Sequence, residues 1–265
     1  MQPMLNTALE VARSTADMIY KAYERVDTLD VEAKGTNDFV TKVDKTSEAM
    51  IIEGLRKRYP RHSFLGEEFG LQEGEDKDYV WVIDPLDGTT NFIHGIPQFA
   101  ISIGLKVKGQ MEVAVVINPV SKEEFTASRG RGAQMNGRRI RVSKKTKLEG
   151  ALLSTGFPFR PDQNRIFDAY MGMFGDFAKA TAGIRRAGAA SLDLAYVAAG
   201  RYDGFWEFGL SEWDMAAGSL LVTEAGGLIG DLKGGMDHMK SGNIVCAPPK
   251  LFKAMLQTIH PHMPK

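Results

Sequence analysis

The sequence of 265 residues has one cysteine, Cys246, and no excess of either charge, because 33 Lys and Arg residues balance 33 Asp and Glu residues. A single cysteine excludes an intrachain disulfide and a zinc site built from several cysteines. Balanced charge excludes a protein that binds nucleic acid through a general basic excess. Hydrophobic residues make up 43% of the chain, which is ordinary for a globular protein and predicts a sizeable core.

Long apolar runs and a secretory leader are missing as well. No stretch reaches the roughly 18 apolar residues of a membrane span. Residues 1–20 lack the basic start and the apolar block of a signal peptide. Together with the lone cysteine, these absences favour a reducing, cytoplasmic location and predict no membrane contact.

The hydrophobic pattern predicts a mixture of strands and helices. Apolar residues at three- and four-residue steps predict helices at 1–24, 46–59, 166–177, 190–199 and 213–225, and a last helix from 248. Alternating or β-branched runs predict strands at 79–83, 99–107, 111–117, 205–208 and 243–247, and a hairpin turn at 136–137. Because no linker separates the two halves, we expect one domain over residues 1–265, with two lobes meeting near residue 150.

The segment 84–91, Asp-Pro-Leu-Asp-Gly-Thr-Thr-Asn, carries the most chemistry. Asp84 and Asp87 leave the end of a predicted strand, and Thr89 to Asn91 fit the caps of a helix start. Carboxylates at a strand end hold hard cations, and free amides at a helix start bind phosphate. For Asp-x-x-Asp-Gly alone, an ordinary turn between a strand and a helix is the competing interpretation.

Acidic residues also stand in two other places. Glu67 and Glu68 lie between glycines, where a solvated turn is the simpler interpretation, and Asp214 lies where a helix N-cap is expected. If Glu67, Asp84, Asp87 and Asp214 converge, they repel unless cations lie among them, and oxygen-only ligands favour Mg²⁺. Two such ions, roughly 3.5–4 Å apart, can activate a water and stabilise the leaving oxygen of a phosphate ester.

Segments 66–68, 84–92 and 213–218 together resemble the motifs of the inositol monophosphatase family of Mg²⁺-dependent, lithium-sensitive phosphatases. The resemblance runs from residue 34 to the C-terminal helix. It implies layers of α and β structure in an αβαβα sandwich, of the type shared with fructose-1,6-bisphosphatase, and a homodimer. It also implies hydrolysis of a small phosphomonoester by water that two Mg²⁺ ions activate. Myo-inositol 1-phosphate is the default substrate, while glycerol 2-phosphate, a nucleoside monophosphate and other sugar phosphates stay open.

The resemblance implies metal ligands position by position. Glu67, Asp84 and the carbonyl of Leu86 would hold the first Mg²⁺. Asp84, Asp87 and Asp214 would hold the second, near the leaving oxygen.

It also implies residues for the water and the substrate. Thr89, with Asp44, would orient the attacking water, and the amides of Gly88 and Thr89 would bind the phosphate. Glu207 would bind substrate hydroxyls, beside a loop formed by Gly188, Ala189 and Ala190. Two positions depart from the family pattern. Phe69 stands where Ser or Thr is frequent, and Gly156-Phe157 stands where animal members place a Ser that contacts substrate.

The chain contains a basic stretch although its net charge is zero. Eight cations and no acid lie between residues 129 and 147, and Arg185-Arg186 forms a second, smaller basic spot. One interpretation is a set of solvated cations that guards an edge strand. The other is a contact surface for RNA or an acidic protein, with the candidate residues Arg138, Arg139, Arg141 and Arg185.

The resemblance is closest to a bacterial branch of the family, and that branch implies a second role. Its members join ribosomal-RNA transcription complexes, so RNA polymerase and Nus-type factors are candidate partners and antitermination is a candidate function. The alternative to an enzyme is therefore a transcription-complex binding factor with vestigial phosphatase activity.

Overall fold

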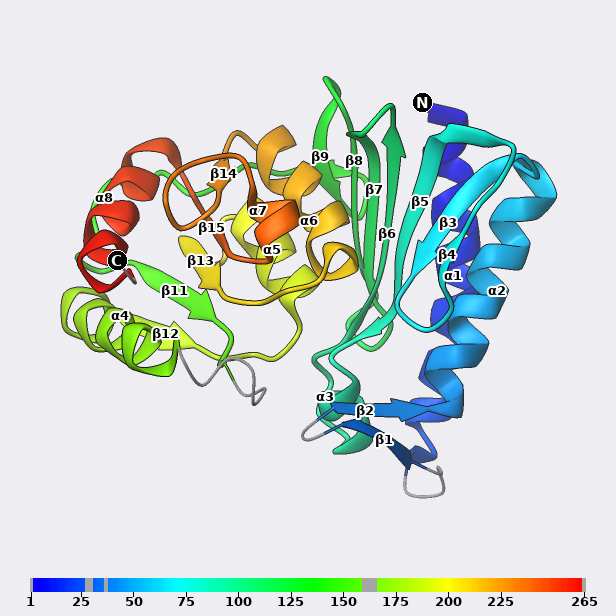
Figure 1. Ribbon diagram of the computed structural model, residues 1–265, viewed down its shortest axis with the longest axis horizontal. Coiled ribbons are helices and arrows are strands. Elements are labelled where there is room, and N and C mark those ends of the chain that lie inside the picture. The colour runs from blue at the N-terminus through cyan, green and yellow to red at the C-terminus, as the bar shows by residue number, and fades with distance from the viewer. Residues whose placement is uncertain (1, 27–30, 36–37, 159–165, 264–265) are drawn as a thin grey trace.

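Five layers of helix and sheet make up the protein, as the computed structural model shows (Figure 1). It describes residues 2–26, 31–35, 38–158 and 166–263, and of residues 31–35 and 38–41 only the backbone. The layers are a helix pair, an eight-stranded sheet, a second helix pair, a five-stranded sheet and a third helix pair. The predicted αβαβα sandwich is confirmed.

The eight-stranded sheet has the order β10-β9-β8-β7-β6-β5-β3-β4, and all neighbours are antiparallel except β3 and β5. Helices α1 (Gln2–Tyr23) and α2 (Lys42–Arg58) cover its outer face (Figure 1). The strands are β3 (His62–Gly66), β4 (Gly70–Gln72), β5 (Asp76–Asp87), β6 (Ala100–Val107), β7 (Gln110–Asn118), β8 (Glu123–Ser128), β9 (Gly132–Met135) and β10 (Arg138–Arg139). A separate pair, β1 (Val31–Gly35) and β2 (Asp38–Thr41), lies beside the short helix α3 (Thr89–Ile93).

The five-stranded sheet has the order β12-β11-β13-β15-β14 and uses only residues after 151. Its strands are β11 (Leu152–Thr155), β12 (Gly183–Arg185), β13 (Gly204–Glu207), β14 (Leu228–Gly230) and β15 (Ile244–Ala247). Helices α5 (Ala190–Ala198) and α6 (Glu212–Glu224) lie between the two sheets (Figure 1). The outer face is covered by α4 (Phe167–Ala180) and α8 (Pro249–Ile259), while α7 (His238–Ser241) and the 3₁₀ turn His260–His262 are shorter.

Three buried hydrophobic clusters hold the layers together, and strand alternation explains them. Trp81 packs toward α1 and α2, whereas its neighbour Val82 packs toward α5 and α6. On β13, Phe205 joins the middle cluster and Trp206 the outer one. Successive strand residues point to opposite faces, so each sheet, covered on both sides, is apolar on both. Cys246 lies fully buried in β15, which agrees with a core role.

Several boundaries differ from the predictions. Helix α2 begins at Lys42, four residues before the predicted start, because the polar first turn hides its amphipathic pattern. Strand β5 extends to Asp87, so both aspartates belong to the strand. The short strands β3, β4, β8, β11, β12 and β14 were not predicted, since three to six residues carry little periodic signal. In the described part of the chain, no helix has both the length and the apolar composition needed to cross a membrane.

His62 predicts a pH dependence of stability. Its ring stacks between Tyr59 and Tyr79, and its Nδ1 accepts a hydrogen bond of 3.1 Å from Trp81 Nε1. Burial lowers the pKa of His62 below 6.5, so the unfolded chain takes up the proton first and stability falls as the pH drops below 6.5. We expect the melting temperature of His62→Gln to fall less between pH 8 and 5.5 than that of the wild type. Equal falls would contradict this role.

Candidate functional site

Asp84 lies at the centre of the candidate site, near the end of β5. Its side chain is 1% exposed, and its Oδ1 accepts a hydrogen bond of 3.0 Å from the amide of Leu86. Burial, together with repulsion from Glu67, Asp87 and Asp214, raises the pKa of Asp84 well above its usual value. The fold therefore brings the four predicted carboxylates, from three separate segments, within electrostatic reach of one another.

Asp87 is held by the start of α5. Its Oδ2 accepts hydrogen bonds from the amide and the hydroxyl of Ser191, at 2.7 and 2.5 Å. Burial outweighs these bonds and raises the pKa of Asp87 to about 6. Ser191 could not be predicted from the sequence, because it lies 104 residues from Asp87 in the chain and no local pattern indicates the contact.

Asp214 lies in the first turn of α6 and is not its N-cap, which is the position that the sequence predicts. Ser211 is the N-cap, and Asp214 is the third helical residue, whose Oδ2 accepts a 2.7 Å bond from the Ser211 amide. This is a capping box, which fixes the carboxylate at the helix start. The macrodipole of α6 also favours a negative charge there.

Thr89 and Asp44 are brought together, as the resemblance implies. The Thr89 hydroxyl lies 2.9 Å from Asp44 Oδ1 and 3.1 Å from the carbonyl oxygen of Leu86. A carbonyl oxygen and an ionised carboxylate can only accept hydrogen bonds, so the Thr89 hydroxyl is the donor to both groups. The lone pairs of Oγ1 are then available to accept a hydrogen bond from a water.

The predicted helix caps at Thr89 to Asn91 are wrong. The N-cap is Gly88, with φ of 93°, and no side chain caps this helix of five residues. The short Asp-Gly turn enters the helix through the left-handed region, which a glycine adopts easily. Any anion here would therefore bind to individual amides, because so short a helix adds little macrodipole.

The loop 188–190 lies against the Asp-Gly turn. The sequence predicts only a cap at Asn91, but its side chain donates from Nδ2 to the carbonyl oxygens of Gln98 and Ala187, at 2.7 and 2.8 Å. Gly88 also approaches the carbonyl of Gly188. Asn91 thus fixes the loop beside the two amides that were predicted to bind phosphate.

Glu207 lies at the end of β13, directly over Gly156. A Cβ atom at position 156 would lie 1.8 Å from Glu207 Oε1, so the carboxylate fills the space that a serine side chain would need. The departure at Gly156 therefore has a physical reason in this chain. Burial and the charges of Glu207 and Asp87 raise the pKa of Asp193, which is buried on α5.

The donor set fits a hard cation by its chemistry. Its members offer only oxygen, and a buried Asp84 surrounded by three other acids gains stability when a positive charge lies among them. Within the residues that the structure describes, however, no three His, Cys, Asp or Glu side chains stand close enough to form a ready ligand set. The Mg²⁺ site therefore stays a prediction.

The basic candidates do not belong to this site. Arg138 and Arg139 form β10, the edge strand of the eight-stranded sheet, and Arg141 follows it. Arg185 ends β12, the edge strand of the other sheet. All four residues are exposed. Their places fit both the guarding of an edge strand and a contact surface.

Comparison with known proteins gives a consistent result. The chain is 61% identical to the Nus factor SuhB of Pseudomonas aeruginosa over 266 aligned residues, covering 100% of this chain and 98% of the relative. It matches the structure of the extragenic suppressor protein suhB from Bartonella henselae with a TM-score of 0.93 and 42% identity, over 96% of this chain and 97% of that one.

A solved IMPase from Thermotoga maritima is similar as well, with a TM-score of 0.88 and 32% identity over 99% and 98% of the two chains. The family model for the inositol monophosphatase family matches residues 1–263. With the sandwich fold and the acidic site, these similarities lead to one conclusion: the chain belongs to the inositol monophosphatase family.

Proposed function

We propose that the protein is a Mg²⁺-dependent phosphatase of small phosphomonoesters, with myo-inositol 1-phosphate as its main substrate. The observation that carries this proposal is the buried Asp84, whose pKa is raised by burial and by three other carboxylates. Glu67, Asp84 and the Leu86 carbonyl would hold one Mg²⁺, and Asp84, Asp87 and Asp214 a second. When bound, the ions would lower the pKa of a coordinated water and stabilise negative charge on the phosphate and the leaving oxygen.

The chain's own residues position the reactants. The hydroxyl hydrogen of Thr89 is directed to Asp44 and Leu86, so its oxygen accepts a hydrogen bond from the attacking water. This bond orients a lone pair of the water toward phosphorus. The amides of Gly88 and Thr89 donate to the phosphate oxygens. Because the water attacks directly, no Ser or Cys nucleophile is needed, and buried Cys246 takes no part.

Glu207 and the loop 188–190 would bind the rest of the substrate. A carboxylate accepts hydrogen bonds from sugar or inositol hydroxyls, and Glu207 lies over a glycine that leaves room for it. The family to which the chain belongs supports inositol 1-phosphate as first choice. Glycerol 2-phosphate, nucleoside monophosphates and other sugar phosphates are the competing substrates.

A substrate panel tests this proposal. Purified protein is assayed for phosphate release from these esters with Mg²⁺, with EDTA and with Mg²⁺ plus lithium. We expect the highest kcat/KM with myo-inositol 1-phosphate, complete loss in EDTA with recovery on adding Mg²⁺, and inhibition by lithium. No phosphate release from any ester would overturn the proposal, and a different best substrate would change only the substrate assignment.

A second function is favoured by one observation. A relative that is 61% identical along the whole chain is named a Nus factor. We infer that this protein, as a homodimer, also joins a transcription complex of RNA polymerase and Nus-type factors and acts in ribosomal-RNA antitermination. The exposed Arg138, Arg139, Arg141 and Arg185 are the proposed contacts. Copurification of RNA polymerase with the tagged protein at physiological salt tests this function, and absence of copurification would contradict it.

A further inference from the structure

Glu48, on α2, is a fully buried acid that the proposed reaction does not use. Its carboxylate accepts two backbone hydrogen bonds, from the Glu68 amide to Oε2 at 2.8 Å and from the Phe69 amide to Oε1 at 2.9 Å. Both amides belong to the turn between β3 and β4, which also carries Glu67. Hydrogen bonds to a charged acceptor are about twice as strong as neutral ones.

Gly66 supplies the space for this contact. A Cβ atom at position 66 would lie 2.1 Å from Glu48 Oε1 and 2.3 Å from Cδ, so the carboxylate packs directly against the glycine. Glu48 therefore touches the residue before Glu67 and bonds to the two residues after it. The backbone on both sides of Glu67 is fixed to one buried side chain.

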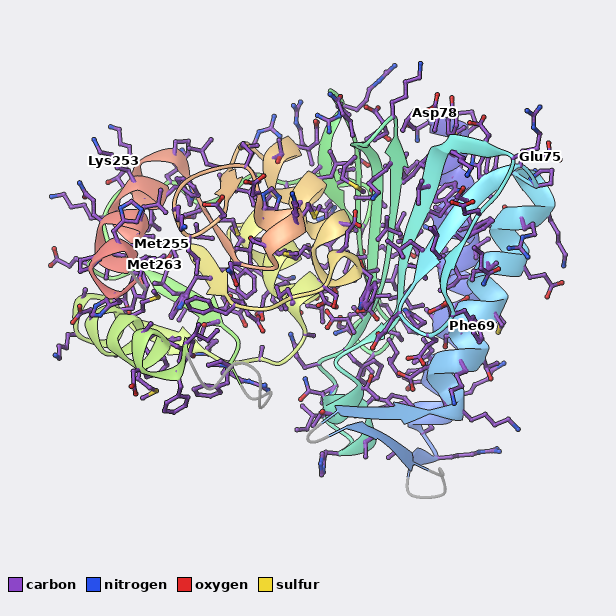
Figure 2. All side chains as sticks on the ribbon, in the orientation of Figure 1. Phe69, Glu75, Asp78, Lys253, Met255 and Met263 are labelled. Carbon is purple, nitrogen blue, oxygen red and sulfur yellow. The ribbon has the colours of Figure 1, made fainter. Side chains whose placement is uncertain are left out.

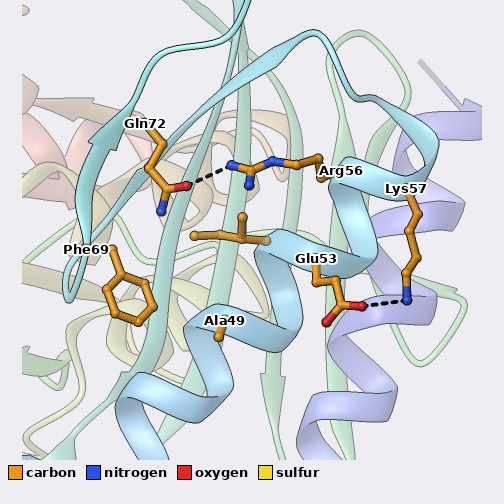
Figure 3. Close-up of a pocket in the computed structure, with 7 residues that line it drawn as sticks. Ala49, Glu53, Arg56, Lys57, Phe69 and Gln72 are labelled. Atoms are coloured by element: carbon orange, nitrogen blue, oxygen red, sulfur yellow. Dashed lines mark hydrogen bonds and ion pairs between the residues drawn. The ribbon is translucent and has the colours of Figure 1, made fainter.

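The outer side of the same turn is open. Phe69 is 47% exposed and borders a groove of about 390 Å³ between β4 and α2, which Arg56 and Gln72 also line (Figure 3). A hydrogen bond of 2.7 Å from Arg56 to Gln72 ties β4 to α2 there, and Phe69 lies on the side of the sheet that α2 covers (Figures 2 and 3). The turn is thus bordered by a groove on its exposed side and bonded to buried Glu48 through its backbone.

The same helix face also serves Thr89. Asp44 precedes Glu48 by four residues, one helical turn, and both side chains are buried. Asp44 accepts from the Thr89 hydroxyl, while Glu48 holds the turn of Glu67. The start of α2 thus sets the spacing between the residue proposed to orient the water and a proposed ligand of the first Mg²⁺.

We propose that Glu48 is a positioning residue, which orders the β3–β4 turn so that Glu67 is held in place for Mg²⁺. This inference rests on the proposed function, because it takes Glu67 as a metal ligand.

The test is Glu48→Gln, which keeps the shape but removes the charge and turns an NH₂ group toward one of the two amides. Hydrogen–deuterium exchange in EDTA measures the order of residues 66–70, and calorimetric titration with Mg²⁺ measures affinity. We expect exchange in this turn and the Mg²⁺ dissociation constant each to rise by about tenfold or more. The substrate KM at saturating Mg²⁺ should stay within about twofold of the wild type, which a general loss of structure would not allow.

Glu53→Gln is the matched control. Glu53 lies on the same helix, is exposed and pairs with Lys57, so this variant should leave exchange and Mg²⁺ affinity unchanged. If Glu48→Gln does not fold, Glu48→Asp keeps the charge with a shorter reach and should give the same two changes at smaller size. Wild-type exchange and wild-type Mg²⁺ affinity in a folded Glu48 variant would overturn the inference. Failure of the wild-type protein to bind Mg²⁺ would instead overturn the proposed function, while exchange in EDTA still decides whether Glu48 orders the turn.

Discussion

The Asp87→Asn variant is expected to lose phosphatase activity by about a thousandfold or more. Asp87 is the proposed ligand of the second Mg²⁺, and an amide offers that ion one neutral oxygen in place of a charged carboxylate. Stabilisation of charge by a catalytic metal is worth several kcal/mol, and each 1.4 kcal/mol or so changes a rate tenfold. The measurement is kcat/KM for myo-inositol 1-phosphate over a range of Mg²⁺ concentrations.

Stability measured in EDTA provides the control for this variant. Asp87 is one of three acids that repel buried Asp84, so its neutralisation relieves repulsion without removing volume. The amide oxygen that replaces the carboxylate can still accept a hydrogen bond from Ser191. We therefore expect the melting temperature in EDTA at pH 8 to equal or exceed that of the wild type. Near-normal turnover that still depends on Mg²⁺ would contradict the proposed metal site.

The charged site could be predicted only in part from local patterns. Asp84 and Asp87 are three residues apart, which indicates that they share a strand end. No periodicity indicates that Asp214 lies beside them. The resemblance to a family supplied that step. The structure adds its physical reason: Ser102, which pairs with Asp84 across the sheet, donates a 3.4 Å bond to the carbonyl of Trp213 at the start of α6, and the capping box of α6 fixes Asp214.

The residues that support the site could not be predicted. Ser191, Asn91 and Glu48 act through contacts that span 104, 96 and 20 residues of chain. Each residue type has an ordinary local explanation, as a cap, a turn residue or a polar position of an amphipathic helix. Only the three-dimensional packing shows that their polar groups turn inward to hold the candidate site.

The layered fold could be predicted better than its edges. Strands β6 and β7 were predicted nearly in full, whereas β5 (Asp76–Asp87) was predicted only over residues 79–83. Strands β4 and β12, of three residues each, owe their conformation to pairing with neighbours rather than to their own sequence. The first turn of α2, which carries Asp44, was not predicted as helix either, because its residues are mostly polar and show no amphipathic pattern.

The triple variant Arg138→Glu, Arg139→Glu and Arg141→Glu reverses the charge at and after β10. It should weaken transcription-complex binding and keep phosphatase activity, whereas Asp87→Asn should lose phosphatase activity. We expect binding to the transcription complex to weaken by about tenfold or more at physiological salt, because like charges at an interface cost several kcal/mol. Phosphatase activity should stay within about twofold, since these residues lie on the edge strand β10 and not at the acidic site. The measurements are copurification of RNA polymerase and kcat/KM.

A second triple variant controls for net charge. Lys240, Lys250 and Lys253 are exposed as well, and Lys253 lies on α8, in the outer helix layer opposite to that of α1 and α2 (Figures 1 and 2). Reversal of these three lysines changes the total charge by the same amount but should leave complex binding intact. If both triple variants weaken binding equally, the contact is a general effect of charge. If the arginine variant binds like the wild type, β10 serves only to guard the edge of its sheet, as charged edge strands commonly do.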